Sequence, residues 1–302
     1  MSTPATPRCP VRPAVPLALW PVAQTSAQDQ RAGRYVPAGA QHPAPMLPEL
    51  ARRIITEYSA PGQHVVDVMA GIGTTVVEAA LLDRHAVGVE VDPRWAEIAR
   101  TNLDHALNRK QRARAEIRVG DARAPGGALG DLAGLVDLIC VSPHYACDGA
   151  AFDKTTPHPR GRRSSAASPG CARNRAKLGH TCGRAYEATM AEIYAGCFDV
   201  LRPGGTLVTV TRNSRRSGRT HDRAGRTVTL CRAAGFGYTQ HVVAIDAAIR
   251  DGELVASSPA RALAGIRRAR QGGEPAHLVV HEDVCVFVKP ETAVSSEADH
   301  GR

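Results

Sequence analysis

The 302-residue sequence lacks a hydrophobic run long enough to cross a membrane. Its predominantly apolar stretches, such as Val65–Ala70 and Val136–Val141, are far shorter than the ~20 residues of a membrane span. A convincing signal peptide is also missing, because the apolar stretch Val11–Ala23 is broken by prolines and no small-residue cleavage site follows it. We therefore expect a cytoplasmic protein with no membrane partner.

Paired cysteines are absent as well. The chain has eight cysteines but no CxxC pair, whereas structural zinc sites use ligands two to four residues apart. The sequence therefore predicts no metal site. Several cysteines lie in apolar or helical context, which is typical of reduced core residues.

Lysine is scarce, with 4 residues against 34 arginines. No Asp or Glu occurs between Lys154 and Arg184, a segment that holds eight basic residues. The longer segment Lys154–Arg232 has 16 basic and 4 acidic residues, so it contains the whole net charge of +9. Such a concentrated surplus is typical of proteins that bind a polyanion, although a solvated arginine-rich loop has the same composition.

The chain divides into one long domain and two tails. Prolines recur at every third residue from Pro4 to Pro16, which is the period of a polyproline II helix. We therefore expect residues 1–40 to be a proline-rich, disordered tail. Residues 41–290 form one domain, which includes a basic loop at about 149–184, and residues 291–302 form a second disordered tail.

Apolar segments that read as buried strands alternate with segments of helical periodicity. The expected strands are residues 64–69, 86–90, 116–119, 136–141, 206–211, 238–245 and 284–289. The expected helices are residues 47–60, 74–83, 93–107, 186–201 and 227–234. Alternation of this kind predicts an α/β fold with a doubly wound, mainly parallel sheet of seven strands.

Acids and glycines gather at the ends of the first strands, where ligands bind in such sheets. Asp67 ends the first strand and is followed by Gly71 and Gly73, which allow a tight turn and close approach to a ligand. A dinucleotide fingerprint would need a third glycine where this chain has Val76. A carboxylate beside the loop suits a ligand with an ammonium or sulfonium group.

Two further acids lie at the ends of the next strands. Glu90 closes the second strand, where it can accept from both hydroxyls of a ribose, and Asp121 follows the third, where an adenine amino group would lie. Taken with the loop, these acids favour S-adenosylmethionine (SAM) over NAD. The alternative is that Asp67 and Glu90 only cap loops.

The fourth strand runs into Ser142-Pro143-His144-Tyr145. The exocyclic amino group of a nucleobase is a poor nucleophile, because its lone pair is delocalised into the ring. The Ser142 hydroxyl and the Pro143 carbonyl can accept the amino hydrogens and return the lone pair to nitrogen, while Tyr145 offers a face for stacking. The remaining catalysis would be positioning and electrostatics.

Together these motifs resemble those of DNA amino-methyltransferases that act on cytosine N4 or adenine N6. Asp67–Thr75 resembles their Asp-Pro-Phe-x-Gly-x-Gly-Thr-Thr loop, and Ser142–Tyr145 resembles their Ser/Asp-Pro-Pro-Tyr motif. His42–Met46 and His281–Lys289 resemble the segments that precede the loop and close the sheet. The resemblance implies a class I, Rossmann-like methyltransferase with SAM as cofactor. The cofactor contacts it implies are His42, Asp67, Ala70, Gly71, Gly73, Thr74, Glu90 and Asp121, and the catalytic residues are Ser142, Pro143 and Tyr145.

The resemblance also implies a substrate. Family members flip the target base out of the duplex, and a leading Ser in the motif favours cytosine N4 over adenine N6. DNA is the expected partner, with RNA possible, and the oligomeric state is left open. Basic residues of the loop would contact phosphates with little sequence preference. They are Arg160, Arg162, Arg163, Arg173, Arg175 and Lys177.

Departures from the family pattern keep alternatives open. His144 replaces the second proline, and Val68 and Met69 replace Pro-Phe, which also fits a catalytically silent nucleic-acid-binding relative. An RNA amino-methyltransferase of the tRNA guanine N2 type has a similar domain. A cytosine C5 methyltransferase is excluded, because it needs a Pro-Cys nucleophile and the chain has no Pro-Cys dipeptide.

Overall fold

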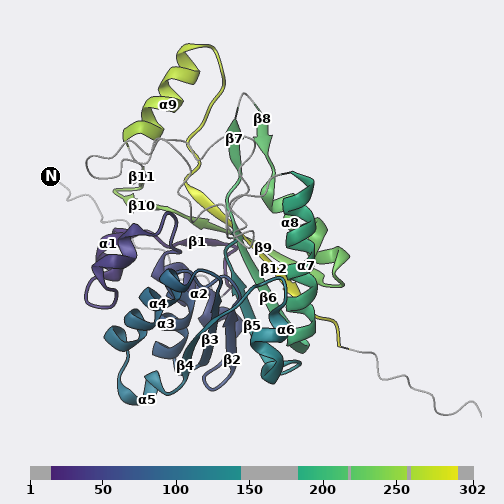
Figure 1. Ribbon diagram of the computed structural model, residues 1–302. Helices are drawn as coiled ribbons and strands as arrows, with labels where there is room; N and C mark the ends of the chain where they lie inside the picture. Colours follow the sequence, from purple (N-terminus) through teal and green to yellow (C-terminus); the bar gives the residue numbers. More distant parts are fainter. Residues whose placement is uncertain (1–14, 144–182, 217–218, 257–259, 292–302) are drawn as a thin grey trace, which may run out of the picture.

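The computed structural model describes residues 15–143, 183–216, 219–256 and 260–291, which build an α/β fold around one central sheet (Figure 1). The eight strands of this sheet lie in the order β1-β9-β12-β6-β5-β2-β3-β4. Strand β12 is antiparallel to β6 and β9, and the other neighbouring pairs are parallel. In this order the strands are Leu19–Pro21, Gly237–Ile245, His281–Val288, Leu201–Thr211, Val136–Val141, His64–Asp67, His85–Glu90 and Ala115–Val119. The predicted doubly wound, mainly parallel fold is confirmed.

Helices cover both faces of the sheet (Figure 1). One face packs against α2 (Pro48–Tyr58), α3 (Thr74–Leu81) and α4 (Pro93–Ala106), and the other against α6 (Pro125–Leu129), α7 (Arg184–Val200) and α8 (Arg223–Ala233). Successive residues of β2 therefore belong to different cores, Val65 to the first and Val66 to the second. Burial on both faces explains why these strands appear in the sequence as continuous apolar runs.

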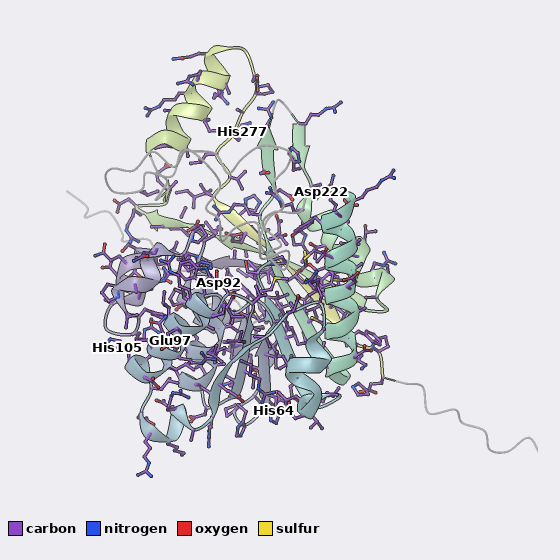
Figure 2. All side chains as sticks on the ribbon, in the orientation of Figure 1. His64, Asp92, Glu97, His105, Asp222 and His277 are labelled. Carbon is purple, nitrogen blue, oxygen red and sulfur yellow. The ribbon has the colours of Figure 1, made fainter. Side chains whose placement is uncertain are left out.

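Several short elements have no counterpart among the predicted ones. The β7–β8 hairpin and α9 lie beyond the carboxyl ends of the parallel strands (Figure 1). In Figure 2, His64 marks the amino end of these strands, at the start of β2, and Asp92 marks their carboxyl end, just beyond β3. The additional elements are α1 (Ala27–Arg31), η1 (Pro37–Gln41), α5 (Arg109–Arg112), η2 (Gly130–Leu132), β7 (Ser214–Arg216), β8 (Arg219–His221), β10 (Ala247–Arg250), β11 (Glu253–Ala256) and α9 (Ala260–Gln271).

The predicted tail at residues 1–40 is wrong for its described part, residues 15–40, and the sheet has eight strands rather than seven. Residues 19–21 form β1, which pairs in parallel with residues 243–245 of β9. Trp20 is buried, lies 6.3 Å from the Tyr58 ring and is covered by the Arg53 guanidinium. An edge strand tolerates Pro21 because one side of it needs no ladder donors.

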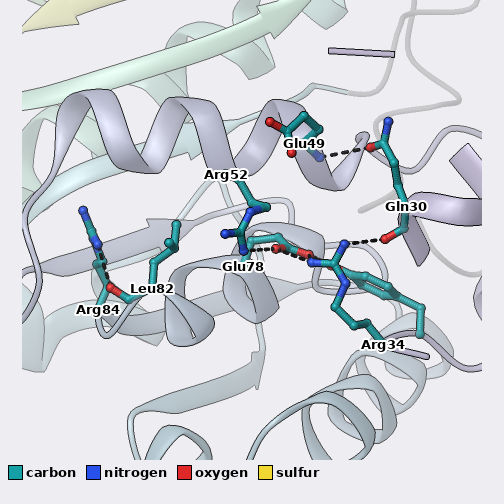
Figure 3. A network of polar contacts seen from close by, with 8 residues as sticks. Gln30, Arg34, Glu49, Arg52, Glu78, Leu82 and Arg84 are labelled. Carbon is teal, nitrogen blue, oxygen red and sulfur yellow. Dashed lines mark hydrogen bonds and ion pairs between the residues drawn. The ribbon is translucent and has the colours of Figure 1, made fainter. Parts of the chain in front are cut away.

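A buried carboxylate fastens this N-terminal segment to the domain (Figure 3). Glu78 on α3 is fully buried and accepts two hydrogen bonds of 2.9 Å from Arg34. The hydroxyl of Tyr35 donates to Glu78 at 2.7 Å, and Arg52 on α2 donates at 3.1 Å. The segment before α2 is therefore part of the folded domain.

The cysteines at described positions are free and buried: Cys140, Cys197, Cys231 and Cys285. Among the described residues, no helix combines the length and the apolar character that a bilayer crossing requires.

Candidate functional site

The loop between β2 and α3 has a backbone conformation that strongly favours glycine at two positions. Gly71 has φ of +53° and Gly73, the N-cap of α3, has φ of +80°, the left-handed region that disfavours side chains. A Cβ at Gly71 would lie 3.1 Å from Nε2 of His42, and one at Gly73 would lie 3.0 Å from Cβ of Ala99. The two glycines thus let the loop approach both His42 and α4 closely.

Asp67, at the end of β2, is held rigidly inside this loop. It is 4% exposed and accepts hydrogen bonds from the Thr75 hydroxyl at 2.7 Å and from the Met69 backbone N–H at 2.9 Å. Burial raises the pKa of Asp67 to about 6, against these hydrogen bonds, which lower it. A buried carboxylate of this kind gains from a cation placed beside it.

Glu90, at the end of β3, is hydrogen-bonded to the same loop. Its carboxylate accepts from the backbone N–H of Gly71 and of Asp92, each at 2.8 Å. Burial raises the pKa of Glu90, while the backbone hydrogen bonds lower it. Glu90 therefore connects the glycine loop to the turn that precedes α4.

Val76 of α3 occupies the position of the missing third glycine, and a glycine on the neighbouring strand makes room for it. A Cβ at Gly88 of β3 would lie 2.8 Å from side-chain atoms of Val76, Ala70 and Ile117. Helix α3 therefore packs closely on the sheet although it carries Val76, because the strand beneath it carries glycine. In the dinucleotide fingerprint the glycine that permits this close packing lies on the helix; in this protein it lies on the strand, at Gly88.

A cleft of about 840 Å³ opens above these loops, within the size range of small-molecule sites. It brings together seven of the predicted site residues. They are His42, Asp67, Ala70, Gly71, Thr74, Ser142 and Pro143. The cofactor loop and the first half of the Ser142–Tyr145 motif thus share one cavity. Tyr145 and the six basic residues at positions 160–177 lie outside the described residues.

Asp121 and Glu90 are not among the residues that line this cleft. The Asp121 carboxylate accepts hydrogen bonds of 3.0 Å from Nε of Arg123, and this pairing lowers the pKa of Asp121. Glu90 acts on the loop rather than facing the cavity. Over the ranges that the structure covers, no three His, Cys, Asp or Glu side chains gather as metal ligands would.

The sequence did not point to two other parts of the cleft wall. Residues 23–27, assigned to the tail, line it together with His42, and no pattern in the sequence had indicated them. The opposite wall includes Val210, Arg212, Asp246, Ala248 and Glu282. Of these, Arg212 is one of the basic residues of the segment Lys154–Arg232, whose basic surplus the sequence had indicated.

Comparison with known proteins agrees with the motifs. Residues 11–101 match the family described as DNA methylase. A type II methyltransferase from Methanothermobacter thermautotrophicus is 36% identical over 59 residues, which are 20% of this chain and 17% of that relative. The matched stretch is therefore a small part of the relative's length.

Solved structures with a similar arrangement include TrmN from Thermus thermophilus, at 18% identity and a TM-score of 0.46, over 86% of this chain and 53% of that one. A SAM-dependent methyltransferase from Methanosarcina mazei has 15% identity and a TM-score of 0.46, over 79% and 98% of the two chains. The resemblance of the sequence to DNA amino-methyltransferases is confirmed, and the family match covers residues 11–101, the part of the chain that holds the glycine loop.

Proposed function

We propose that the chain is a SAM-dependent methyltransferase that acts on an exocyclic amino group of a DNA base, on cytosine N4 in preference to adenine N6. The observation that supports this most is the shared cleft, in which Asp67 and the glycine loop lie together with Ser142 and Pro143. A methyl donor and an acceptor base must meet in one cavity for direct transfer.

The residues present fit SAM. Thr74 has a buried hydroxyl without a hydrogen-bond partner in the cleft wall, and the buried carboxylate of Asp67 lines the same cavity. We assign the cofactor to Asp67, Thr74, the glycine loop and His42, with Glu90 and Asp121 as further contacts predicted from the motif. When bound, SAM supplies an electrophilic methyl group.

The acceptor is oriented by the turn after β5. The hydroxyl of Ser142, which is half-buried, and the carbonyl of buried Pro143 accept the two amino hydrogens of the base. These two hydrogen bonds localise the lone pair on the amino nitrogen, which can then attack the methyl group. The methylated nitrogen is cationic and becomes neutral by releasing one of its two protons to solvent. Tyr145 stacks on the flipped base, and the basic residues at positions 160–177 contact the phosphates, so binding weakens as salt rises.

The test is to incubate the protein with SAM and, separately, with unmethylated genomic DNA or unmodified tRNA, and to digest both to nucleosides for mass spectrometry. We expect N4-methylcytosine from DNA, with N6-methyladenine as the second possible product. N2-methylguanine from tRNA would contradict the DNA assignment. Binding of SAM without any new methyl group on DNA or tRNA would indicate another substrate or a silent scaffold.

Replacement of Ser142 by alanine provides a sharper check. Ser142→Ala removes one acceptor for the amino hydrogens, so we expect turnover to fall by roughly 10²-fold or more, with SAM affinity unchanged. Ser142→Asp keeps an acceptor oxygen at this position and should retain more activity than alanine. Turnover of Ser142→Ala equal to wild type would remove Ser142 from the mechanism.

A further inference from the structure

An ion cluster forms the wall of the cleft on the side away from the glycine loop. Nη2 of Arg212, just after β6, lies 2.7 Å from Oδ2 of Asp246 and 2.8 Å from Oε1 of Glu282. Asp246 follows β9 and Glu282 is the second residue of β12. Three neighbouring strand ends are thus tied together where they border the cavity.

Strand register places this cluster close to Ser142 and Pro143. Val141 of β5 pairs with Thr209 of β6, and Thr211 pairs with Asp283 of β12. Extending the first pairing by two residues puts Pro143 level with Thr211. Asp283 of β12 is therefore level with Pro143, and Glu282 lies one residue beyond that level. Because β12 is the second strand from β5, the backbones of Glu282 and Pro143 are about 10 Å apart at the usual strand spacing.

Side-chain alternation puts Glu282 on the same face of the sheet as Asp67. Val284 and Val286, which follow Glu282 at a spacing of two, belong to the core under α2–α4, as does Val65, two residues before Asp67. Both carboxylates line one cavity. Two acids and one arginine in the cluster, with Asp67 opposite, make the cleft unfavourable for a phosphate and suitable for a neutral ring.

We propose that Glu282, held by Arg212, which also pairs with Asp246, contacts the ring edge of the acceptor base beside its amino group and so selects the base. This inference rests on the proposed function. Arg212 donates to Oε1 of Glu282, so a neutral carboxyl group carries its proton on Oε2. That proton is donated to the ring nitrogen on the Watson–Crick edge beside the amino group, which is the acceptor N3 in cytosine and the acceptor N1 in adenine, whereas the Watson–Crick-edge nitrogen of guanine, N1–H, is a donor.

The charges around Glu282 are consistent with a neutral form. The pKa of Glu282 is raised to about 7, chiefly by burial and also by Asp246 and Asp283, while Arg212 lowers it. Arg250 also lines the cavity. Deprotonation above this pKa turns the donor into an acceptor and weakens binding of cytosine or adenine, so wild-type activity should decline on the alkaline side of about pH 7.

The experiment compares kcat/KM on DNA between pH 6 and pH 9 for wild type, Glu282→Gln and Glu282→Ala, with SAM affinity and melting temperature of each. Glutamine donates a hydrogen at every pH, so we expect Glu282→Gln to stay active and lose the alkaline decline. Glu282→Ala should lose roughly 10- to 100-fold with SAM affinity unchanged. Glu116→Gln removes the carboxylate of an arginine pair on β4, outside the cleft lining, and should behave as wild type.

Two results would overturn the inference. One is an alkaline decline in Glu282→Gln equal to that of wild type; the other is loss of SAM binding and melting temperature in Glu282→Ala, which would show a structural role. If wild type itself methylates neither DNA nor RNA, the proposed function fails first and this inference fails with it. If wild type methylates DNA and the variants keep its pH profile, only the role of Glu282 fails.

Discussion

Asp67→Asn is expected to stabilise the protein at pH 8 by up to about 3 kcal/mol and to abolish SAM binding. Burial raises the pKa of Asp67 from 3.8 to about 6, and each unit corresponds to about 1.4 kcal/mol. The charged carboxylate is therefore unfavourable in the folded protein, and we infer that it is retained because a cationic ligand compensates for it. Asparagine removes the charge and this compensation together.

The pH dependence of this effect follows from the direction of the pKa shift. Between the unfolded pKa of Asp67, near 4, and its folded pKa of about 6, the folded state binds more protons than the unfolded state, so its stability falls as pH rises. Below pH 4 both states are protonated, and the variant should have almost no advantage. The gain should grow from pH 4 to pH 6 and then stay constant.

Urea denaturation at pH 4.5 and pH 8, with calorimetric titration of SAM, measures both effects. Asp131→Asn is the matched control, because the Asp131 carboxylate lies at the surface and its pKa is lowered by Arg118. That replacement should not stabilise the protein at pH 8 and should leave SAM binding intact. Equal SAM affinity of wild type and Asp67→Asn would contradict the cofactor role of Asp67.

The sequence predicted the central sheet well because its strands are buried on both faces. Val65 and Val66 are adjacent yet belong to different cores, and only a covered strand shows such a run. The site could be predicted for a related reason. Asp67 ends β2 and Ser142 follows β5, and these neighbouring parallel strands have their carboxyl ends at the same edge of the sheet.

Features that depend on distant contacts could not be predicted. Strand β1 pairs with residues more than 200 positions away, and a three-residue strand has no periodicity of its own. Gly88 is required because Ala70, Val76 and Ile117 pack against it, which no local pattern shows. The link between Arg212 and Glu282 joins residues 70 positions apart in the sequence, and it appears only once β6 and β12 are paired.

Glu78→Ala is expected to destabilise the protein by about 3 kcal/mol, the lower end of what breaking a buried ion pair costs. The fully buried carboxylate accepts from Arg34, Arg52 and the Tyr35 hydroxyl. Both arginine side chains are about a third exposed, at 31% and 37%, so they can regain water when the partner is lost. The Tyr35 hydroxyl is buried and would be left without its acceptor.

Loss of the Glu78 contacts should also disturb the cleft. Arg34 and Tyr35, which Glu78 ties to α3, lie in the same segment as the cleft residues 23–27 and His42. We expect weaker SAM binding and faster proteolysis of the segment before α2, measured by calorimetry and by mass spectrometry of the digest. Glu78→Gln keeps acceptors for Tyr35 and should fall between alanine and wild type. Glu57→Gln removes only an i,i+4 surface pair with Arg53, and surface pairs contribute little. If Glu78→Ala unfolds at the same urea concentration as Glu57→Gln, the N-terminal segment is held by Trp20 and the pairing of β1 rather than by this carboxylate.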